Sequence, residues 1–294
     1  MNFDERLRAL PHLGLGVSTE YGASASQGAL DVMKLRREHP AYAAFLEVGV
    51  EVSKGLDDDD QAWVEAGGAT TYHFLDINLD DPSDQDARWL EEVRGIAEVL
   101  RPAWMCGDAG LWHFGPRDRA HMTLLPPILS RDAALDMGDG ISRLRASTGF
   151  EVLPENPPGT VYLGDLHLLD FFAAVLEEGD TGMLLDCAHL AIYQRLMGHP
   201  PLTALDGFPL HRVVEVHVAG GVEKEHDGFR WVEDDHTPEV LPDTWEIFEY
   251  VAERAPHLRA VVFECERNTL EQAVTGFTEL SARLKRAGHF EGLL

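Results

Sequence analysis

Short apolar segments alternate along this chain with longer segments in which apolar residues recur at helical spacing. The short segments predict strands at residues 13–17, 45–48, 70–77, 103–106, 150–154, 183–186, 213–218 and 260–264. The longer segments predict helices at residues 85–100, 131–147, 166–178, 244–254 and 270–285. Strands that alternate with helices in this way indicate βα units and a parallel sheet.

The number and spacing of the strands favour a closed barrel over an open sheet, because eight strands are the number in a (β/α)8 barrel. Glu155, Asp186 and His217 stand at or near the ends of successive predicted strands, and each is 31 positions from the next. That interval is about the length of one βα unit, on the order of 30 residues. We therefore predict an α/β fold, a TIM barrel, with residues 1–294 forming a single domain.

The net charge of the chain is −27, from 24 Lys and Arg against 51 Asp and Glu. So few cationic residues argue against nucleic acid and acidic membrane surfaces as partners. No segment approaches the ~20 consecutive apolar residues of a membrane span, and the start, MNFDERLRAL, lacks the apolar stretch of a signal peptide. We therefore expect a cytoplasmic protein. The cysteines, Cys106, Cys187 and Cys265, are odd in number and far apart, so we expect small buried side chains rather than disulfides.

Acidic and imidazole side chains gather at the predicted strand ends, where the loops of a βα barrel converge. They are Glu47, Glu51, His73, Asp108, Glu155, Asp186, His189, His217, Asp235, His236, Glu264 and Glu266. Carboxylates at one barrel mouth repel one another unless protons or cations neutralise them. Divalent metal is the simplest solution, and mixed imidazole and carboxylate ligands suit Fe(II), Mn(II) or Zn(II).

Each of these residues also has a structural interpretation. A Glu or Asp that ends a strand is commonly the N-cap of the next helix or the partner of a cation. His73, within the segment TYHFLDI, fits a hydrogen-bonded core histidine. Trp112, His113 and Phe114 either line a pocket or fix the loop after the fourth strand. The metal hypothesis rests on all of these residues together, because chance alone would have to place such side chains at five strand ends.

Several of these motifs resemble those of the multinuclear non-haem iron-dependent oxidative enzymes. The resemblance is most specific in one ordered series: Glu155-Asn156, Leu185-Asp186 with His189, residues 215–220 (EVHVAG), Asp235-His236 and residues 264–267 (ECER). Glu47 and Glu51 match the family's strand-two E-x-x-x-E motif, His73 its strand-three histidine, and residues 124–127 (LLPP) its LLPxP segment. The resemblance spans nearly the whole chain.

The resemblance implies a TIM barrel that binds two or three iron ions of mixed Fe2+ and Fe3+ state and uses O2 as co-substrate. Such enzymes oxidise residues, often cysteines, of ribosomally made precursor peptides, and many act with a companion protein that binds the peptide leader. The implied metal ligands are His73, Glu155, Asp186, His189, His217, Asp235, His236 and Glu264. Of these, Asp186, His189 and Asp235 are also the expected catalytic residues, and additional candidate ligands are Glu47, Glu51, Asp108 and His113.

The chain departs from the family pattern after the fourth strand, where the family has S-[DE]-H-L-x-W. Here the sequence is Cys106-Gly107-Asp108-Ala109-Gly110-Leu111-Trp112, with Ala109 at the histidine position. His113 or His121, from the same loop, are candidate replacements. Ser18 stands where the family often has Arg. The number of metal ions therefore stays open at this stage.

Two other functions fit the same residues. A divalent-metal sugar isomerase, epimerase or hydrolase would use Glu155, Asp186, His217 and Glu264 to bind Mn(II), Mg(II) or Zn(II) and to organise substrate hydroxyl groups. A barrel that has lost catalysis would bind metal or peptide without turnover, which would fit the missing strand-four histidine.

Overall fold

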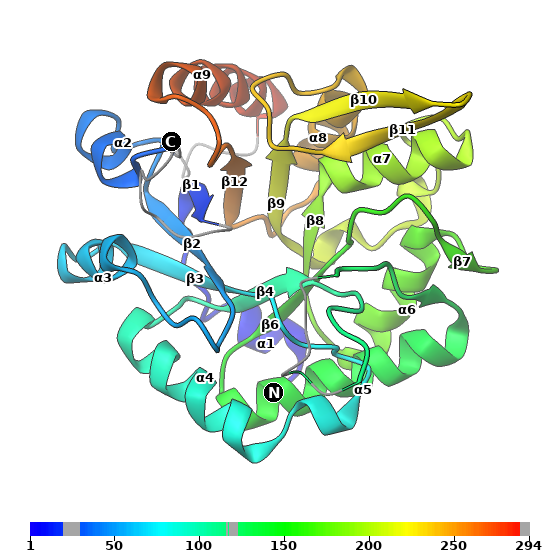
Figure 1. The fold of residues 1–294 in the computed structure, drawn as a ribbon, viewed down its shortest axis with the longest axis horizontal. Coiled ribbons are helices and arrows are strands. Elements are labelled where there is room, and N and C mark those ends of the chain that lie inside the picture. The colour runs from blue at the N-terminus through cyan, green and yellow to red at the C-terminus, as the bar shows by residue number, and fades with distance from the viewer. Residues whose placement is uncertain (20–29, 116, 118–122, 289–294) are drawn as a thin grey trace.

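Eight parallel strands close into a barrel (Figure 1), which confirms the predicted (β/α)8 fold. The computed structural model describes residues 1–19, 30–115, 117 and 123–288. The barrel order is β1-β12-β9-β8-β6-β4-β3-β2, and β1 closes the ring by pairing with both β12 and β2. The strands are β1 (Gly14–Thr19), β2 (Phe45–Val50), β3 (Ala69–Phe74), β4 (Met105–Asp108), β6 (Val152–Glu155), β8 (Met183–Asp186), β9 (Val213–Ala219) and β12 (Ala260–Glu264).

Amphipathic helices surround the barrel and pack their apolar faces on the strands. The five helices predicted from sequence match α4 (Ala87–Leu100), α5 (Arg131–Thr148), α6 (Leu168–Gly179), α8 (Pro242–Arg254) and α9 (Leu270–Ala287). Three more belong to the same ring: α2 (Val32–Glu38), α3 (Asp58–Glu65) and α7 (Cys187–Met197). Single 3-10 turns lie at Pro82–Asp84, Leu205–Gly207 and Leu210–Arg212.

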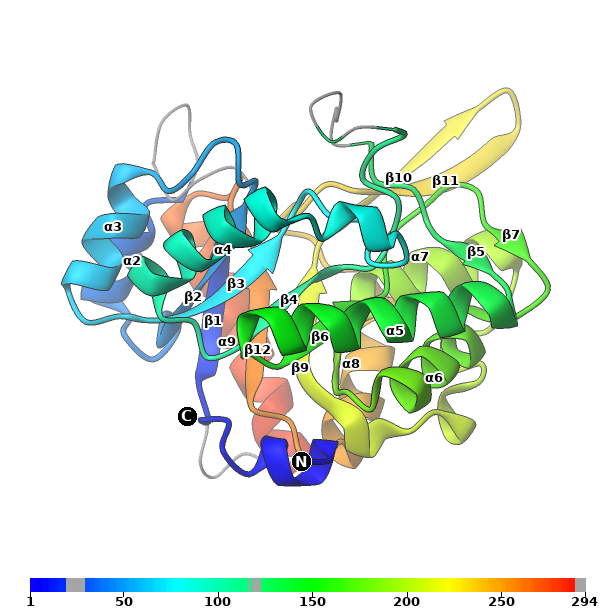
Figure 2. The same ribbon diagram turned by 90° about the horizontal axis from the view of Figure 1, so that it is seen from below.

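The short helix α1 (Phe3–Leu7) lies at the amino-terminal end of the strands (Figure 2). Phe3 and Leu7 pack in one cluster with the barrel residues Phe45, Trp104 and Leu153. All five side chains are at most 3% exposed. This apolar plug seals one end of the barrel, so the polar side chains of the strands have access only through the opposite end.

Two small sheets stand outside the barrel. Strand β5 (Ile128–Leu129) pairs in parallel with β7 (Leu163–Gly164), and β10 (Gly221–His226) forms an antiparallel hairpin with β11 (Phe229–Asp234). The hairpin projects beyond the ring of helices at the carboxyl ends of the strands (Figures 1 and 2). Its two-residue loop has positive φ at Asp227 (51°) and Gly228 (81°), which is the geometry of a type I′ turn.

No helix within the described ranges combines the length and the apolarity that a bilayer crossing requires.

Two glycines in the outer helices give a matched test of this packing. Gly140 in α5 lies against the loop after β3, and a Cβ there would overlap the carbonyl oxygen of Leu79. Gly95 in α4 is exposed, and a Cβ there would have no heavy atom within 4 Å. We expect Gly140→Ala to lower the free energy of unfolding by about 1–3 kcal/mol, because backbone must move. We expect Gly95→Ala to raise it by about 0.5–1 kcal/mol, because alanine favours the helix.

Urea denaturation of both variants measures the two effects against the parent protein. Equal effects of the two substitutions would contradict the described packing of α5 on the loop.

Candidate metal centre

The carboxyl ends of the barrel strands surround a cavity of about 340 Å³. Five barrel strands, β1, β2, β3, β4 and β12, contribute residues to the lining of this cavity. The acidic and imidazole side chains of β6, β8 and β9 are buried and do not line it. The lining residues are Ser18, Thr19, Glu47, Gly49, His73, Leu75, Asp108, Trp112, Leu124, Pro158, His189, Asp234, His236 and Glu264. Trp112 thus lines the pocket, one of the two roles expected for its loop.

His217, from β9, occupies the centre of the polar cluster and is fully buried. Its Nδ1 lies 3.3 Å from Glu155 Oε1, 3.4 Å from Glu264 Oε1 and 3.9 Å from Asp186 Oδ2. Its Nε2 lies 3.0 Å from Glu47 Oε1. Despite these distances, neither ring nitrogen has the alignment of a hydrogen bond to any described residue. The imidazole is therefore surrounded by carboxylates that it does not satisfy.

One side of the cluster is formed by β3, β4 and β6. His73 Nε2 lies 2.8 Å from Glu155 Oε2, and the ligand atoms of His73, Asp108 and Glu155 all lie within 4.8 Å of one another. His189 joins this side from α7, and its Nδ1 lies 3.7 Å from Asp108 Oδ1. The same nitrogen donates a hydrogen bond of 2.9 Å to the carbonyl oxygen of Asn156.

The other side is formed by the end of β11 and by β12. Asp234 Oδ2 lies 3.1 Å from His189 Nε2 and 3.2 Å from His236 Nε2. His236 Nε2 is also 3.7 Å from Glu264 Oε2. The opposite ring nitrogen of His236, Nδ1, lies 2.8 Å from Glu266 Oε2, and the hydroxyl of Ser18 donates to the second oxygen of Glu266. Glu266 thereby orients His236 so that Nε2 faces the cluster.

Asp186 has two roles at once. It is the N-cap of α7, and its Oδ1 accepts the backbone N–H of His189 at 2.5 Å. Its Oδ2 is buried without a hydrogen-bond partner and points into the cluster. The side chain of Asn156 fixes the backbone of Asp186 with two hydrogen bonds, of 2.9 and 3.0 Å. The N-cap interpretation of this strand-ending acid is therefore confirmed, and its second oxygen remains available to a metal ion.

Carboxyl groups outnumber imidazoles in the cluster, so the cluster is negative whenever all of its acids are ionised, even with every imidazole protonated. Four histidines, His73, His189, His217 and His236, face seven carboxyl groups, Glu47, Asp108, Glu155, Asp186, Asp234, Glu264 and Glu266. All these side chains are at most 16% exposed. Burial of so many like charges requires either protons or bound cations.

The pKa shifts show how strongly the groups compete for protons. Burial alone would lower the pKa of His217, yet the carboxylates of Glu47, Glu264 and Glu155 raise it well above its ordinary value. Burial would also lower the pKa of His73. The carboxylates of Glu47 and Glu155 outweigh burial and raise this pKa to about 10. Without metal, protons on imidazole must supply the positive charge that a cation would otherwise provide.

The acids are affected unequally. Burial would raise the pKa of Glu155, but His217 and His73 hold it far below its ordinary value. Burial raises the pKa of Asp186 to about 7, and the nearby Glu264 and Glu155 add to the effect. Burial also raises the pKa of Asp108 well above normal. Bound cations would lower the raised pKa values of Asp186 and Asp108, because they stabilise ionised carboxylates.

The donor set fits metal ions. Buried oxygens of Asp108, Asp186, Asp234 and Glu264 have no hydrogen-bond partner among the described residues, and neither has the imidazole of His217. Neighbouring groups of ligand atoms share a residue. Glu155 belongs both to the group with His73 and Asp108 and to the group with Asp186 and His217. Glu264 belongs both to the group with Asp186 and His189 and to the group with His236 and Glu266. Shared carboxylates are suited to bridging adjacent ions, and the mixed oxygen and nitrogen donors suit iron, manganese or zinc.

The structure brings together most of the residues singled out from sequence: His73, Glu155, Asp186, His189, His217, His236 and Glu264, with the additional candidates Glu47 and Asp108. Asp235 is not among them, so its prediction as a metal ligand and catalytic residue is corrected here by its position. Its Oδ1 accepts from Arg267 Nη1 at 2.5 Å, and its side chain is 37% exposed. Asp234 takes its place, because alternate residues of an extended segment point to the same side and Asp234 is two positions before His236. That alternation was the signal that could have identified Asp234.

Two further candidates lie outside the cluster. Glu51 Oε2 pairs with Lys54 at 2.7 Å and lines a separate cavity. His113 uses both ring nitrogens elsewhere, Nε2 at 2.8 Å from Asp84 and Nδ1 at 2.7 Å from the carbonyl of Gly115. His113 therefore does not replace the strand-four histidine, whose position Ala109 occupies with no exposure. His121 lies outside the described residues.

All three cysteines are buried and free, as expected. Burial raises the pKa of each thiol well above its ordinary value. Cys106 Sγ donates to Glu47 Oε2 at 3.1 Å, beneath the cluster. Buried thiols of this kind are poor nucleophiles and poor redox groups.

Comparison with known proteins agrees with this architecture. A UPF0276 protein of Acaryochloris marina is 25% identical over 249 residues, which cover 79% of this chain and 85% of the relative. An L-ribulose 3-epimerase structure superposes with a TM-score of 0.56 and 12% identity, covering 93% of this chain and 95% of that one. A xylose isomerase-like TIM barrel protein from Mycobacterium smegmatis in complex with magnesium superposes with a TM-score of 0.57 and 12% identity. The match covers 96% of this chain and 98% of that one. At such low identity these two structures show a shared fold.

The family is settled by a match over most of the chain. Residues 29–288 match the model of the RiPP precursor modification enzymes MbnB/TglH/ChrH. That range includes all the cluster residues, from Glu47 to Glu266, and the resemblance predicted from the strand-end motifs is confirmed. The chain therefore belongs to the MbnB/TglH/ChrH family of RiPP precursor modification enzymes.

Proposed function

We propose that this protein is an iron- and O2-dependent enzyme that oxidises a residue, most simply a cysteine, of a ribosomally made precursor peptide. The observation that carries the proposal is the buried cluster of carboxylates and imidazoles with unsatisfied ligand atoms, at the open end of the barrel of a family member. We propose two or three iron ions of mixed Fe2+ and Fe3+ state. The free buried cysteines fit a reducing compartment such as the cytoplasm. A companion protein that binds the peptide leader is an expected partner.

Three groups of residues would hold the ions. Glu155, Asp186 and His217 form the central group. Glu264 with His236 forms the second, and Asp234 lies against it. The third group, His73 and Asp108 with Glu155, lacks the histidine that Ala109 replaces, so it has fewer protein ligands than the family pattern provides. We therefore expect this third position to be the weakest.

Bound iron would supply the redox chemistry with O2 and would hold a substrate thiol as its thiolate. The chain's own residues provide position and exclusion of water. Glu266 fixes the ring of His236, and Asn156 fixes Asp186, so the ligands are oriented before any ion enters. Trp112, Leu124 and Pro158 form apolar walls of the cavity above the cluster, where a substrate side chain would be shielded from solvent.

A metal-dependent sugar isomerase is the alternative, because this fold is shared with an L-ribulose 3-epimerase. The family match favours peptide modification, and the shared fold by itself selects no chemistry.

Two adjacent acids, Asp234 and Asp235, allow a direct test of the ligand assignment. We expect Asp234→Asn to lower the iron content of anaerobically purified protein, with affinity reduced about tenfold or more, because a carboxylate oxygen beside His236 is lost. Asp235→Asn is the matched control and should retain the parent's iron, since Asp235 faces Arg267. Elemental analysis by mass spectrometry measures both. Loss of iron in Asp235→Asn alone would reverse the assignment.

The proposed chemistry is tested with iron-loaded protein and a peptide substrate. We expect the iron-loaded protein to consume O2 and to change the mass of a cysteine-containing peptide encoded beside its gene. His217→Ala should abolish both effects, because it removes the central imidazole of the cluster. Peptide mass spectrometry and an oxygen electrode provide the readouts. Turnover of a sugar with Mn(II) under strict exclusion of O2 would instead support the isomerase, and bound iron without any turnover would indicate a barrel that has lost catalysis.

A further inference from the structure

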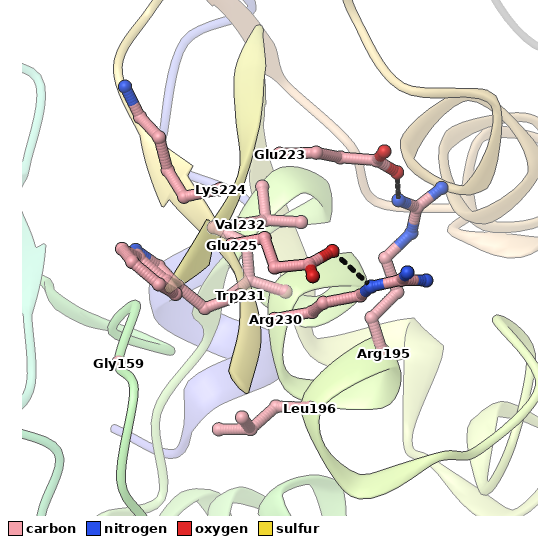
Figure 3. Close-up of a pocket in the computed structure, with 10 residues that line it drawn as sticks. Gly159, Arg195, Leu196, Glu223, Lys224, Glu225, Arg230, Trp231 and Val232 are labelled. Atoms are coloured by element: carbon pink, nitrogen blue, oxygen red, sulfur yellow. Dashed lines mark hydrogen bonds and ion pairs between the residues drawn. The ribbon is translucent and has the colours of Figure 1, made fainter. Parts of the chain in front are cut away.

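Three adjoining cavities lie between the metal centre and the projecting β10–β11 hairpin. The cavity above the cluster shares Leu124, Pro158 and Asp234 with a neighbouring cavity of about 340 Å³. That neighbour shares Gly159, Trp231 and Val232 with a third, of about 410 Å³, which lies between the hairpin and α7 (Figure 3). Each volume is within the range of ligand-binding clefts. We call these adjoining cavities the hairpin groove.

The middle of the hairpin groove follows the edge of β11 rather than one of its faces. Four consecutive residues of this strand, Trp231–Asp234, line the middle cavity. Side chains alternate between the two faces of a strand, so a cavity on one face would be lined by every second residue. No residue of β10 lines it, which places it on the edge of β11 that faces away from its partner strand.

That edge carries backbone groups with no partner in the described part of the chain. Because His226 and Phe229 flank a two-residue type I′ turn, they form a hydrogen-bonded pair, and pairing then alternates along the ladder. Val232 stands opposite Glu223 in a non-hydrogen-bonded pair, so its N–H and C=O point outward. Within the described ranges, residues 221–234 make no backbone hydrogen bond outside this ladder. Such an edge is a template for another strand.

The edge ends at the metal centre. Asp234 is the last residue of β11, and its carboxylate lies 3.1 Å from His189 and 3.2 Å from His236. An extended segment beside β11 would advance by about 3.4 Å per residue, so about three residues take it from Trp231 to Asp234. The wall opposite the edge is formed by Leu124–Pro126 and Pro158–Val161, and Leu125 and Val161 are 41% and 63% exposed.

The charges around the groove disfavour an acidic ligand. Each cation of the hairpin region is already paired with a carboxylate of the chain. Lys224 pairs with Glu233 at 3.3 Å, Arg230 with Glu225 at 2.7 Å, and Arg195 with Glu223. The last two pairs are marked by dashed lines in Figure 3. With a net charge of −27 on the whole chain, a neutral or basic ligand is favoured.

We propose that the outer edge of β11 binds an extended, neutral or basic peptide segment as an added β-strand and delivers its reacting residue to the metal centre beside Asp234. Backbone hydrogen bonds to Val232 would give affinity, and apolar side chains would pack on Leu125 and Val161. This inference rests on the proposed function, because it names the place where the substrate peptide binds. A second copy of this chain that pairs edge to edge is the competing occupant.

The test compares two proline substitutions at paired positions of the hairpin. Val232→Pro removes an outward N–H from β11, and Glu223→Pro removes the corresponding outward N–H from β10, so the ladder between the strands is kept in both. The probe is a displayed library of random 12-residue peptides, presented to the full-length iron-loaded protein. We expect enrichment of peptides with apolar residues at alternate positions. Val232→Pro should weaken their binding about tenfold or more, whereas Glu223→Pro should leave it nearly unchanged.

A second measurement does not depend on the variants folding. N-methylation of an enriched peptide, one residue at a time, should reduce its affinity for the unmodified protein at every second position, because only alternate N–H groups face β11. No enrichment, equal effects of the two prolines, uniform tolerance of N-methylation, or dimers that Val232→Pro dissolves in analytical ultracentrifugation would each overturn the proposal.

Iron content is measured in the same preparations. Iron binding without β11-dependent peptide binding contradicts only the proposal about the groove. Peptide binding by protein that cannot take up iron contradicts the proposed chemistry and leaves the groove proposal intact.

Discussion

Confinement of excess negative charge at the open end of the barrel is the constraint on which the rest of this structure depends. Seven carboxyl groups surround four imidazoles with little access to water, and His217 contacts several carboxylates without a directed hydrogen bond to any. Ionised groups are costly to bury unless they are paired. Protons on the imidazoles and on some of the carboxyl groups offset part of this charge. Metal cations offset it as well, and they also use the ligand atoms that hydrogen bonding leaves unsatisfied.

The barrel makes this confinement feasible. Each strand delivers one or two side chains to the same end, and the apolar plug of Phe3, Leu7 and Trp104 closes the opposite end. Interactions beside the cluster then fix the ligands: Glu266 orients His236, and Asn156 holds the backbone of Asp186. The hairpin extends the site outward, because β11 ends at Asp234 and its free edge leads away from the cluster. One fold thus supplies a metal centre and a path to it.

The sequence was sufficient for the barrel and for most of the cluster, since both depend on periodic features. Glu155 and Asp186 end their strands, His217 lies two residues before the end of β9, and the apolar segments located all eight barrel strands. Asp235 was assigned wrongly because choosing between adjacent acids requires the direction of each side chain. Glu51 and His113 depend on local partners, Lys54 and Asp84, that no periodicity specifies. The hairpin was missed because its residues are largely exposed and lack an apolar pattern.

The most direct test of the central claim is X-ray diffraction at the iron absorption edge, on crystals of protein purified and kept without oxygen. We expect at least two anomalous peaks within bonding distance of ligand atoms of Glu155, Asp186, His217 and Glu264, with His236 and Asp234 beside them. A map with no anomalous peak in this cluster would contradict the claim that the cluster is a metal centre. It would mean that protons alone neutralise His217, Glu155 and their neighbours.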